Sequence, residues 1–107
     1  MAEAVVRPMT EADRVAVLEL NTRAFGQADE ARIIEELEKE GDIVLQLVAE
    51  MDGQVVGHIL FYAMRVFGKL GGAGLGPMSV DPWVQKEGIG KQLVMQGLKV
   101  LKEGGVP

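Results

Sequence analysis

The stretch VDPWVQKEGIGKQLV, from Val80 to Val94, changes character in its middle. It begins like the end of a strand and finishes like the start of an amphipathic helix. Between these halves lies the pattern Gln85-x-x-Gly88-x-Gly90. Glycine disfavours a helix interior by about 1 kcal/mol relative to alanine. Two glycines at the point where a helix begins therefore need a physical reason.

An anion bound at the helix N-terminus would supply that reason. The first N–H groups of a helix have no partner within the helix, and the macrodipole makes that end positive. Several backbone donors can hold a phosphate group there, provided that no large side chain blocks its approach. Lys86 and Lys91 add positive charge beside the glycines. We interpret the pattern as a phosphate-binding loop, with a simple strand-to-helix turn as the alternative.

Two other phosphate-binding motifs do not fit this sequence. A Walker loop requires Ser or Thr after its Gly-Lys pair, whereas Gln92 follows Gly90-Lys91. The dinucleotide-binding pattern places its glycines before a helix. The glycines between residues 71 and 76 have a different spacing and precede a predicted strand.

Working outward from the loop, the chain predicts the element order β-α-α-β-β-β-α. Asp52-Gly53 between two β-rich runs is the strongest hairpin signal, and Gly57 marks a possible bulge. The glycine-rich segment 68–74 is predicted to be a flexible connection. We expect an α/β (α+β) fold in which helices pack on one mixed sheet. The predicted strands are residues 4–8, 43–51, 54–67 and 75–80, and the predicted helices are 11–25, 30–40 and 88–105.

Cap residues and apolar faces support the three helices. Thr10 and Asp29 are suited to start the first two, while Gly41 and Gly104-Gly105 are suited to end the second and third. Each helix also has apolar residues on one face, which we expect to pack on the sheet. They are Ala12, Val15, Ala16 and Leu20, then Ile33, Ile34 and Leu37, and finally Ile89, Leu93, Val94, Leu98 and Leu101.

Composition narrows the possible functions. The 107 residues are 48% apolar and carry a net charge of −5, without a run of Lys or Arg, which argues against a nucleic-acid surface. No cysteine is present, so disulfides and thiolate chemistry are excluded. The longest apolar run, residues 59–64, is far shorter than the roughly 20 residues that span a bilayer. We expect a soluble cytoplasmic domain with no membrane partner and no metal site.

The pattern Gln85-x-x-Gly88-x-Gly90, after the strand GPMSVDP and before a helix, resembles motif A of the GNAT superfamily of N-acetyltransferases. The consensus of this motif in the family is Gln/Arg-x-x-Gly-x-Gly/Ala. The element order, including the hairpin AEMDGQVVGHILF, is also similar, so the resemblance covers the whole chain. It implies acetyl-CoA as cofactor and an amine as acetyl acceptor.

The resemblance also implies the residues that bind the cofactor. Backbone N–H groups of the loop would hold the pyrophosphate, and the preceding strand would pair with the pantetheine arm and polarise the thioester carbonyl. The loop residues are Gln85, Lys86, Glu87, Gly88, Ile89, Gly90 and Lys91, and the strand residues are Met78, Ser79 and Val80.

A GNAT domain normally continues beyond the last helix with a further helix and strands, which usually supply the Tyr that protonates the leaving thiolate. We therefore expect residues 1–107 to be the cofactor-binding N-terminal portion of one incomplete domain and a poor catalyst by itself. The alternative is a non-catalytic acyl-CoA-binding or interaction module with a degenerate acetyltransferase fold. A homodimer is expected through the open edge of the strand 75–80 or through exchange of the last helix.

No catalytic residue is assigned, because each candidate also has a structural interpretation. His58 is a possible base, but its position among apolar strand residues favours a hydrogen-bonded histidine of the sheet. Trp83 is expected to pack at the strand end, with contact to the cofactor as the alternative. Tyr62 is expected to pack, and Ser79 is a poor base without a partner. Phe25 lies where the family often lines its acceptor site. Acidic residues of the second helix could attract an amine, but are more typical of a solvated face: Glu30, Glu35, Glu36, Glu38 and Glu40.

Overall fold

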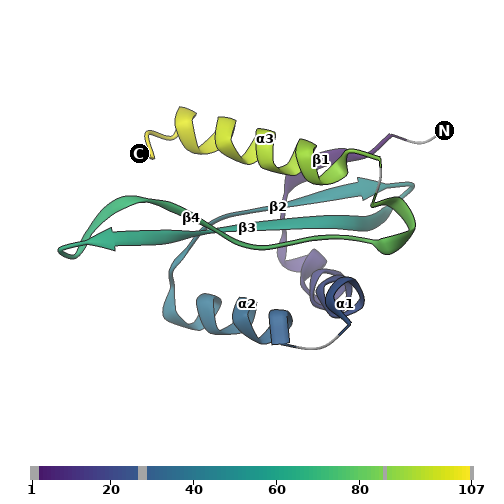
Figure 1. The fold of residues 1–107 in the computed structure, drawn as a ribbon, viewed down its shortest axis with the longest axis horizontal. Helices are drawn as coiled ribbons and strands as arrows, with labels where there is room; N and C mark the ends of the chain where they lie inside the picture. Colours follow the sequence, from purple (N-terminus) through teal and green to yellow (C-terminus); the bar gives the residue numbers. More distant parts are fainter. Residues whose placement is uncertain (1–2, 27–28, 86, 107) are drawn as a thin grey trace.

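The computed structural model describes residues 3–26, 29–85 and 87–106, and it confirms the predicted order of elements (Figure 1). Short 3₁₀ turns precede α1 and follow β4. The strands are β1 (Val5–Pro8), β2 (Ile43–Met51), β3 (Gln54–Val66) and β4 (Lys69–Val80), and the helices are α1 (Arg14–Phe25), α2 (Asp29–Glu40) and α3 (Ile89–Glu103).

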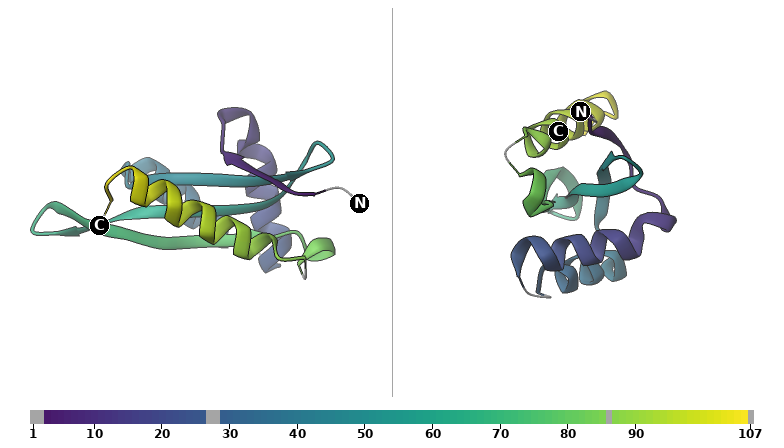
Figure 2. Two further views of the ribbon diagram at one scale, coloured as in Figure 1. Left: turned by 90° about the horizontal axis from the view of Figure 1, so that it is seen from above. Right: turned by 90° about the vertical axis from the view of Figure 1, so that its right-hand side faces the viewer.

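The four strands form one sheet in the order β1-β2-β3-β4, and each described pairing is antiparallel. Helices α1 and α2 cover one face of this sheet, and α3 covers the other (Figures 1 and 2). The expected α/β fold class is therefore confirmed, but the described sheet is antiparallel and not mixed, because consecutive strands pair with each other. The order leaves β1 and β4 as the two edges of the described sheet, and the β4 edge adjoins the predicted loop.

The Asp52-Gly53 hairpin is confirmed. Both residues have positive φ angles, 52° and 77°, as the two central residues of a type I′ turn require. Ala49 pairs with Gly57 and Glu50 pairs with Val55, so β3 carries one extra residue, Val56. The bulge expected near Gly57 is therefore present one residue before it.

The prediction of a flexible connection at residues 68–74 is wrong. Phe67 and Gly68 form a second turn with positive φ angles of 53° and 78°, and residues 69–74 continue into β4. Glycine normally weakens a strand, but here side chains of β3 cover the gaps. A Cβ on Gly74 would lie 2.3 Å from Tyr62 Cζ, so the Tyr62 ring occupies the space above this glycine. The resulting hairpin projects beyond the helices (Figures 1 and 2).

The core consists of two layers separated by the sheet. The layer under α3 is formed by Leu47, Ala49, Val56, Ile59, Phe61, Ile89, Leu93 and Leu101. The layer under α1 and α2 is smaller in apolar content, with Val17, Ile34, Val48 and Leu60. It also contains buried polar side chains, among them Asn21, His58 and Ser79. Side chains that alternate along β2 and β3 supply both layers.

The predicted helix faces are correct only in part. In α1 the buried apolar residues are Val17 and Leu20, whereas Val15 is 67% exposed. In α3 the predicted residue Leu98 is exposed, and Gly97 is buried instead, because the Phe61 ring occupies the place where its side chain would stand. Helix α2 ends as predicted at Gly41, which has a φ of 75° and donates to the Leu37 carbonyl.

Candidate functional site

The loop between β4 and α3 is held at its start by hydrogen bonds of its own residues. The Asp81 N–H donates to the Val56 carbonyl at 2.7 Å, which extends the sheet by one bond. The Asp81 carboxylate accepts from the Trp83 N–H at 3.1 Å, and Gln85 Nε2 donates to the Val80 carbonyl at 3.1 Å. The Gln85 side chain thus bonds to the end of β4, whereas the sequence predicted that its backbone N–H would hold the pyrophosphate.

The N-terminus of α3 offers free backbone donors. Gly88 is the N-cap residue with a left-handed φ of 79°, no side chain of the described residues caps the helix, and its first turn contains no acidic residue. The left-handed conformation explains why position 88 is glycine. The first N–H groups of α3 have no partner within the helix.

Gly90 requires a different explanation. Its φ is not left-handed, and an added Cβ would lie 3.6 Å from Met78 Cε and 3.8 Å from Val80 Cγ2, which is ordinary contact. Neither the backbone nor the protein packing therefore demands glycine here. A glycine here is compatible with the close approach of a bound group to the backbone. Of the other predicted loop residues, Glu87 and Lys91 are exposed and Ile89 is buried, while Lys86 lies outside the described residues.

Strand β4 brings the remaining predicted residues next to this helix. Met78 and Val80 pack toward α3, whereas Ser79 is buried and pairs with His58 on the opposite face. Ile59 pairs with Met78 and Phe61 with Leu75, so two residues of β4, Gly76 and Pro77, face Leu60. This bulge accommodates a proline, which has no N–H to donate.

The outer edge of β4 has no neighbouring strand in the described structure. Its backbone N–H and C=O groups can therefore pair with an extended ligand that contains amide groups. The edge and the uncapped α3 N-terminus meet at Val80. Together they can bind a molecule that has an anionic end and an amide-containing arm.

A cleft of about 650 Å³ lies on the other side of the loop, beside α1 and the β2–β3 turn. Trp83 lines it and is 93% exposed, so the expected packing role of this residue is wrong. The Arg23 guanidinium contacts the Asp81 carboxylate at 3.1 Å and so joins α1 to the loop. Among the carboxylates of the cleft, Glu19 forms no ion pair with a described residue. The cleft is weakly negative and can accept a cationic group.

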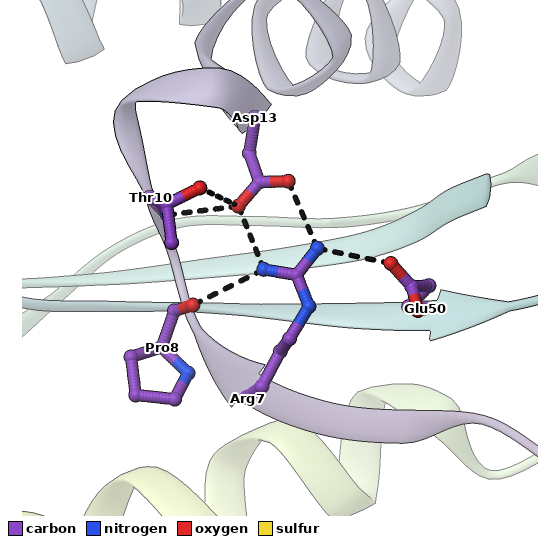
Figure 3. Close-up of polar contacts among 5 residues, drawn as sticks. All are labelled: Arg7, Pro8, Thr10, Asp13 and Glu50. Atoms are coloured by element: carbon purple, nitrogen blue, oxygen red, sulfur yellow. Dashed lines mark hydrogen bonds and ion pairs between the residues drawn. The ribbon is translucent and has the colours of Figure 1, made fainter. Parts of the chain in front are cut away.

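A second ion-pair cluster at the edge of this cleft was not predicted from the sequence (Figure 3). The Arg7 guanidinium contacts the Asp13 carboxylate at 2.7 Å and Glu50 at 3.0 Å. Asp13 also accepts from the Thr10 N–H at 2.8 Å. The hydrogen bond from Arg7 lowers the pKa of Asp13 far below its ordinary value, and the bond to Asp13 raises the pKa of Arg7. The partners are distant in the sequence, so no local pattern indicated them.

His58 is a structural residue of the sheet, as its surroundings predicted. Its Nε2 lies 2.8 Å from Gln46 Oε1, and its Nδ1 lies 3.3 Å from Asn21 Nδ2. Burial lowers the pKa of His58 from 6.5 to about 4. Both ring nitrogens are engaged and no solvent reaches the ring. His58 is therefore not positioned to take a proton from an acceptor amine.

Other candidates add no catalytic group. Tyr62 packs over Gly74, as expected. The side chains of Phe25 and Glu30 lie outside the described part of the chain. Within the described residues, no group of three His, Cys, Asp or Glu side chains could hold a metal ion. None of the described helices is long and apolar enough to span a bilayer.

Comparison with known proteins defines the class of protein. The chain belongs to the acetyltransferase (GNAT) family, whose model matches residues 12–107. A curated relative is the uncharacterized N-acetyltransferase YhbS of Escherichia coli strain K12, which is 34% identical over 103 residues. That match covers 94% of this chain but 62% of the relative. The chain therefore spans less than two thirds of the length of this relative.

Two solved structures share the fold closely. The crystal structure of YhbS from Escherichia coli in complex with CoA superposes with a TM-score of 0.92 at 32% identity, covering 99% of this chain and 60% of that one. A GNAT family acetyltransferase from Brucella melitensis in complex with acetyl-CoA gives a TM-score of 0.90 at 35% identity, covering 97% and 71%. Both similar proteins were thus crystallised with CoA or its acetyl ester.

Proposed function

We propose that this chain is the cofactor-binding portion of an acetyl-CoA-dependent N-acetyltransferase. The observation that carries the proposal is the junction of Gly88, Gly90 and the β4 edge. Gly88 sets the left-handed start of α3. Neither the backbone conformation nor the packing of the described residues demands glycine at position 90, and β4 has no neighbour at its outer edge in the described sheet. The shared family and the two CoA-bound relatives support the proposal over a non-catalytic module.

The residues of this chain would act by binding and orientation. The cofactor, when bound, supplies an activated thioester acyl group. Backbone N–H groups from Gln85 to Lys91 hold the pyrophosphate, aided by the positive end of α3. Backbone groups of Met78, Ser79 and Val80 would align the pantetheine arm, and an N–H of this strand would stabilise negative charge at the thioester oxygen.

The acceptor is proposed to be an amine of unknown identity. It must lose a proton before it attacks, and no described side chain is assigned as the base. The cleft that contains Glu19 and Trp83 can hold a cationic group next to the loop. The cytoplasmic location expected from the sequence stays a prediction.

Calorimetric titration with CoA and with pantetheine, which lacks the phosphates, tests the role of the loop. We expect CoA to bind at least 10-fold more tightly, since charge-assisted hydrogen bonds to phosphate contribute about 1.5–3 kcal/mol each. Gly90→Val should abolish the difference by crowding the backbone donors. Gly90→Ala is the matched control, because the motif accepts Ala here and the space admits a Cβ. Equal affinity of the two ligands would refute the pyrophosphate site.

We further propose that, when no cofactor occupies it, the open edge of β4 pairs with a second copy of the chain. Leu75 on this strand and Leu98 on α3 are both exposed apolar residues, and an unpaired strand edge attracts another strand. Light scattering at micromolar concentration should show a dimer that Leu75→Lys dissociates. A monomer with protected β4 amides in hydrogen exchange would contradict this assembly.

A further inference from the structure

Two buried polar atoms between α1 and the sheet have no hydrogen-bond partner among the described residues. They are Asn21 Oδ1 and Ser79 Oγ. Asn21 is 0% exposed and Ser79 is 3% exposed, so bulk solvent does not reach them. A buried polar atom without a partner has lost its hydrogen bonds to bulk water without forming a replacement. Most buried polar atoms in folded proteins are therefore bonded to protein or to ordered water.

Both atoms belong to residues that adjoin His58. Asn21 Nδ2 lies 3.3 Å from His58 Nδ1. Ser79 pairs with His58 across β3 and β4, and directly paired residues of an antiparallel sheet project from the same face. That face is the one covered by α1, which contacts both β3 and β4. Asn21 and Ser79 therefore border the same buried layer, and both adjoin His58.

Exchanging Oδ1 and Nδ2 of the Asn21 side-chain amide does not give the buried oxygen a partner. Asn21 Nδ2 lies 2.9 Å from the Val17 carbonyl, which can only accept, so the amide nitrogen must be on this side. The same nitrogen then donates to His58 Nδ1, which leaves the ring proton on Nε2, where Gln46 Oε1 accepts it. His58 consequently has no donor left for Asn21 Oδ1 and no acceptor left for Ser79 Oγ.

We propose that one ordered water molecule binds between Asn21 Oδ1 and Ser79 Oγ in this layer. The amide oxygen is an acceptor only, and the hydroxyl can donate or accept. A water molecule satisfies both, because it donates to Asn21 and accepts the Ser79 proton. An ion is unsuited to the layer, because the neighbouring imidazole is neutral and the remaining partners are an amide and a hydroxyl.

The water joins α1 to β4, an edge strand that pairs only with β3 in the described sheet. Ser79 is the only serine of the chain and lies between Met78 and Val80. The link therefore fixes the backbone of β4 next to the α3 N-terminus. The water does not require a bound cofactor and is expected in the protein without ligand.

Two-dimensional NMR of the unmodified chain tests the water directly. A long-lived internal water should give NOE cross-peaks between water protons and the amide protons of His58 and Ser79. These peaks should have the same sign as NOEs between protons of the protein. Ser79→Ala should remove these peaks and increase the hydrogen exchange of the Met78–Val80 amides, while β1 amides remain unchanged. Absence of the peaks in the unmodified chain overturns the proposal.

The direction of the melting-temperature change gives an independent measurement. If water satisfies the hydroxyl, Ser79→Ala loses a hydrogen bond and should lower Tm by about 4–8 °C for a domain of this size. If the hydroxyl is unsatisfied, the same substitution should raise Tm, and this outcome overturns the proposal. Thr22→Val is the control, since Thr22 bonds to its own helix at an exposed site and should change Tm little.

Discussion

The two faces of the sheet bury their side chains by different chemistry. The face under α3 is apolar throughout its buried cluster, from Leu47 to Leu101. The face under α1 and α2 has a hydrogen-bonded chain in its interior, in which Gln46, His58 and Asn21 connect β2, β3 and α1. Figure 2 shows the sheet between α3 on one side and α1 and α2 on the other.

The two kinds of packing contribute differently to the stability of the fold and to the orientation of its helices. Apolar packing is non-directional and stabilises α3 in proportion to the buried area. Hydrogen bonds between buried side chains contribute less net stability, but they require one arrangement of donors and acceptors. The α3 face should therefore be insensitive to pH, whereas the α1 face should hold its helix in one register and respond to protonation.

The largest expected effect is on the apolar face. Leu93→Ala removes a side chain that is 0% exposed and should reduce the free energy of unfolding by about 2–5 kcal/mol, because a cavity remains. Leu98→Ala on the same helix is the control, since Leu98 is 55% exposed and its loss should cost little. Urea denaturation measures both. Equal losses would show that α3 packs through a different face.

The second prediction concerns pH and the polar face. The pKa of His58 is 6.5 in the unfolded chain and about 4 in the folded one, so protonation favours the unfolded state. The stability is fully present above pH 6.5 and is lost as pH falls toward 4. At 1.36 kcal/mol per pKa unit the loss is about 3 kcal/mol.

Urea titrations at pH 7, 5.5 and 4.5 should show this loss. In the His58→Gln variant the free energy of unfolding should depend less on pH. His58 is the only histidine of the chain. The pKa of the folded Asp13 carboxyl lies below its ordinary value, so this group weakens the fold only at still lower pH. Stability that is constant between pH 7 and 4.5 would exclude a neutral buried imidazole.

A smaller effect is expected where α1 begins. Asp13→Ala removes the acceptor of both the Arg7 guanidinium and the Thr10 N–H. We expect a loss of about 1–2 kcal/mol, as for a helix cap with a charged hydrogen bond. Glu11→Ala, an exposed neighbour, is the control. Thermal unfolding compares the two variants, and similar values would mean that the cluster contributes no more than surface charge.

The smallest effect belongs to a site outside both layers. Phe67 is fully exposed at the tip of the β3–β4 hairpin and has a φ of 53°. Asn tolerates this conformation better than Phe, so Phe67→Asn should leave stability unchanged or raise it by up to about 0.5 kcal/mol. A clear decrease in Tm would show that the Phe67 ring packs against something in solution, such as a second copy of the chain.

The sequence predicted well where the signal was local. Gln85-x-x-Gly88-x-Gly90 marked the loop and the start of α3, and Asp52-Gly53 marked the first hairpin. Each rests on the backbone preferences of a few adjacent residues, with glycine at a positive φ. The second hairpin was missed because Phe67-Gly68 is an unusual turn pair and because glycines in a strand indicate flexibility when their neighbours are unknown.

By itself the sequence determined the order of elements, the place of the candidate site and the resemblance to one family, because these depend on local pattern. Only the tertiary structure decided the length of β4, where Tyr62 covers Gly74, and the burial of Val17 in place of Val15. It also brought Asn21, Gln46, His58 and Ser79 together. Contacts between residues far apart in the chain are set by how helices and strands pack, and no local preference specifies them.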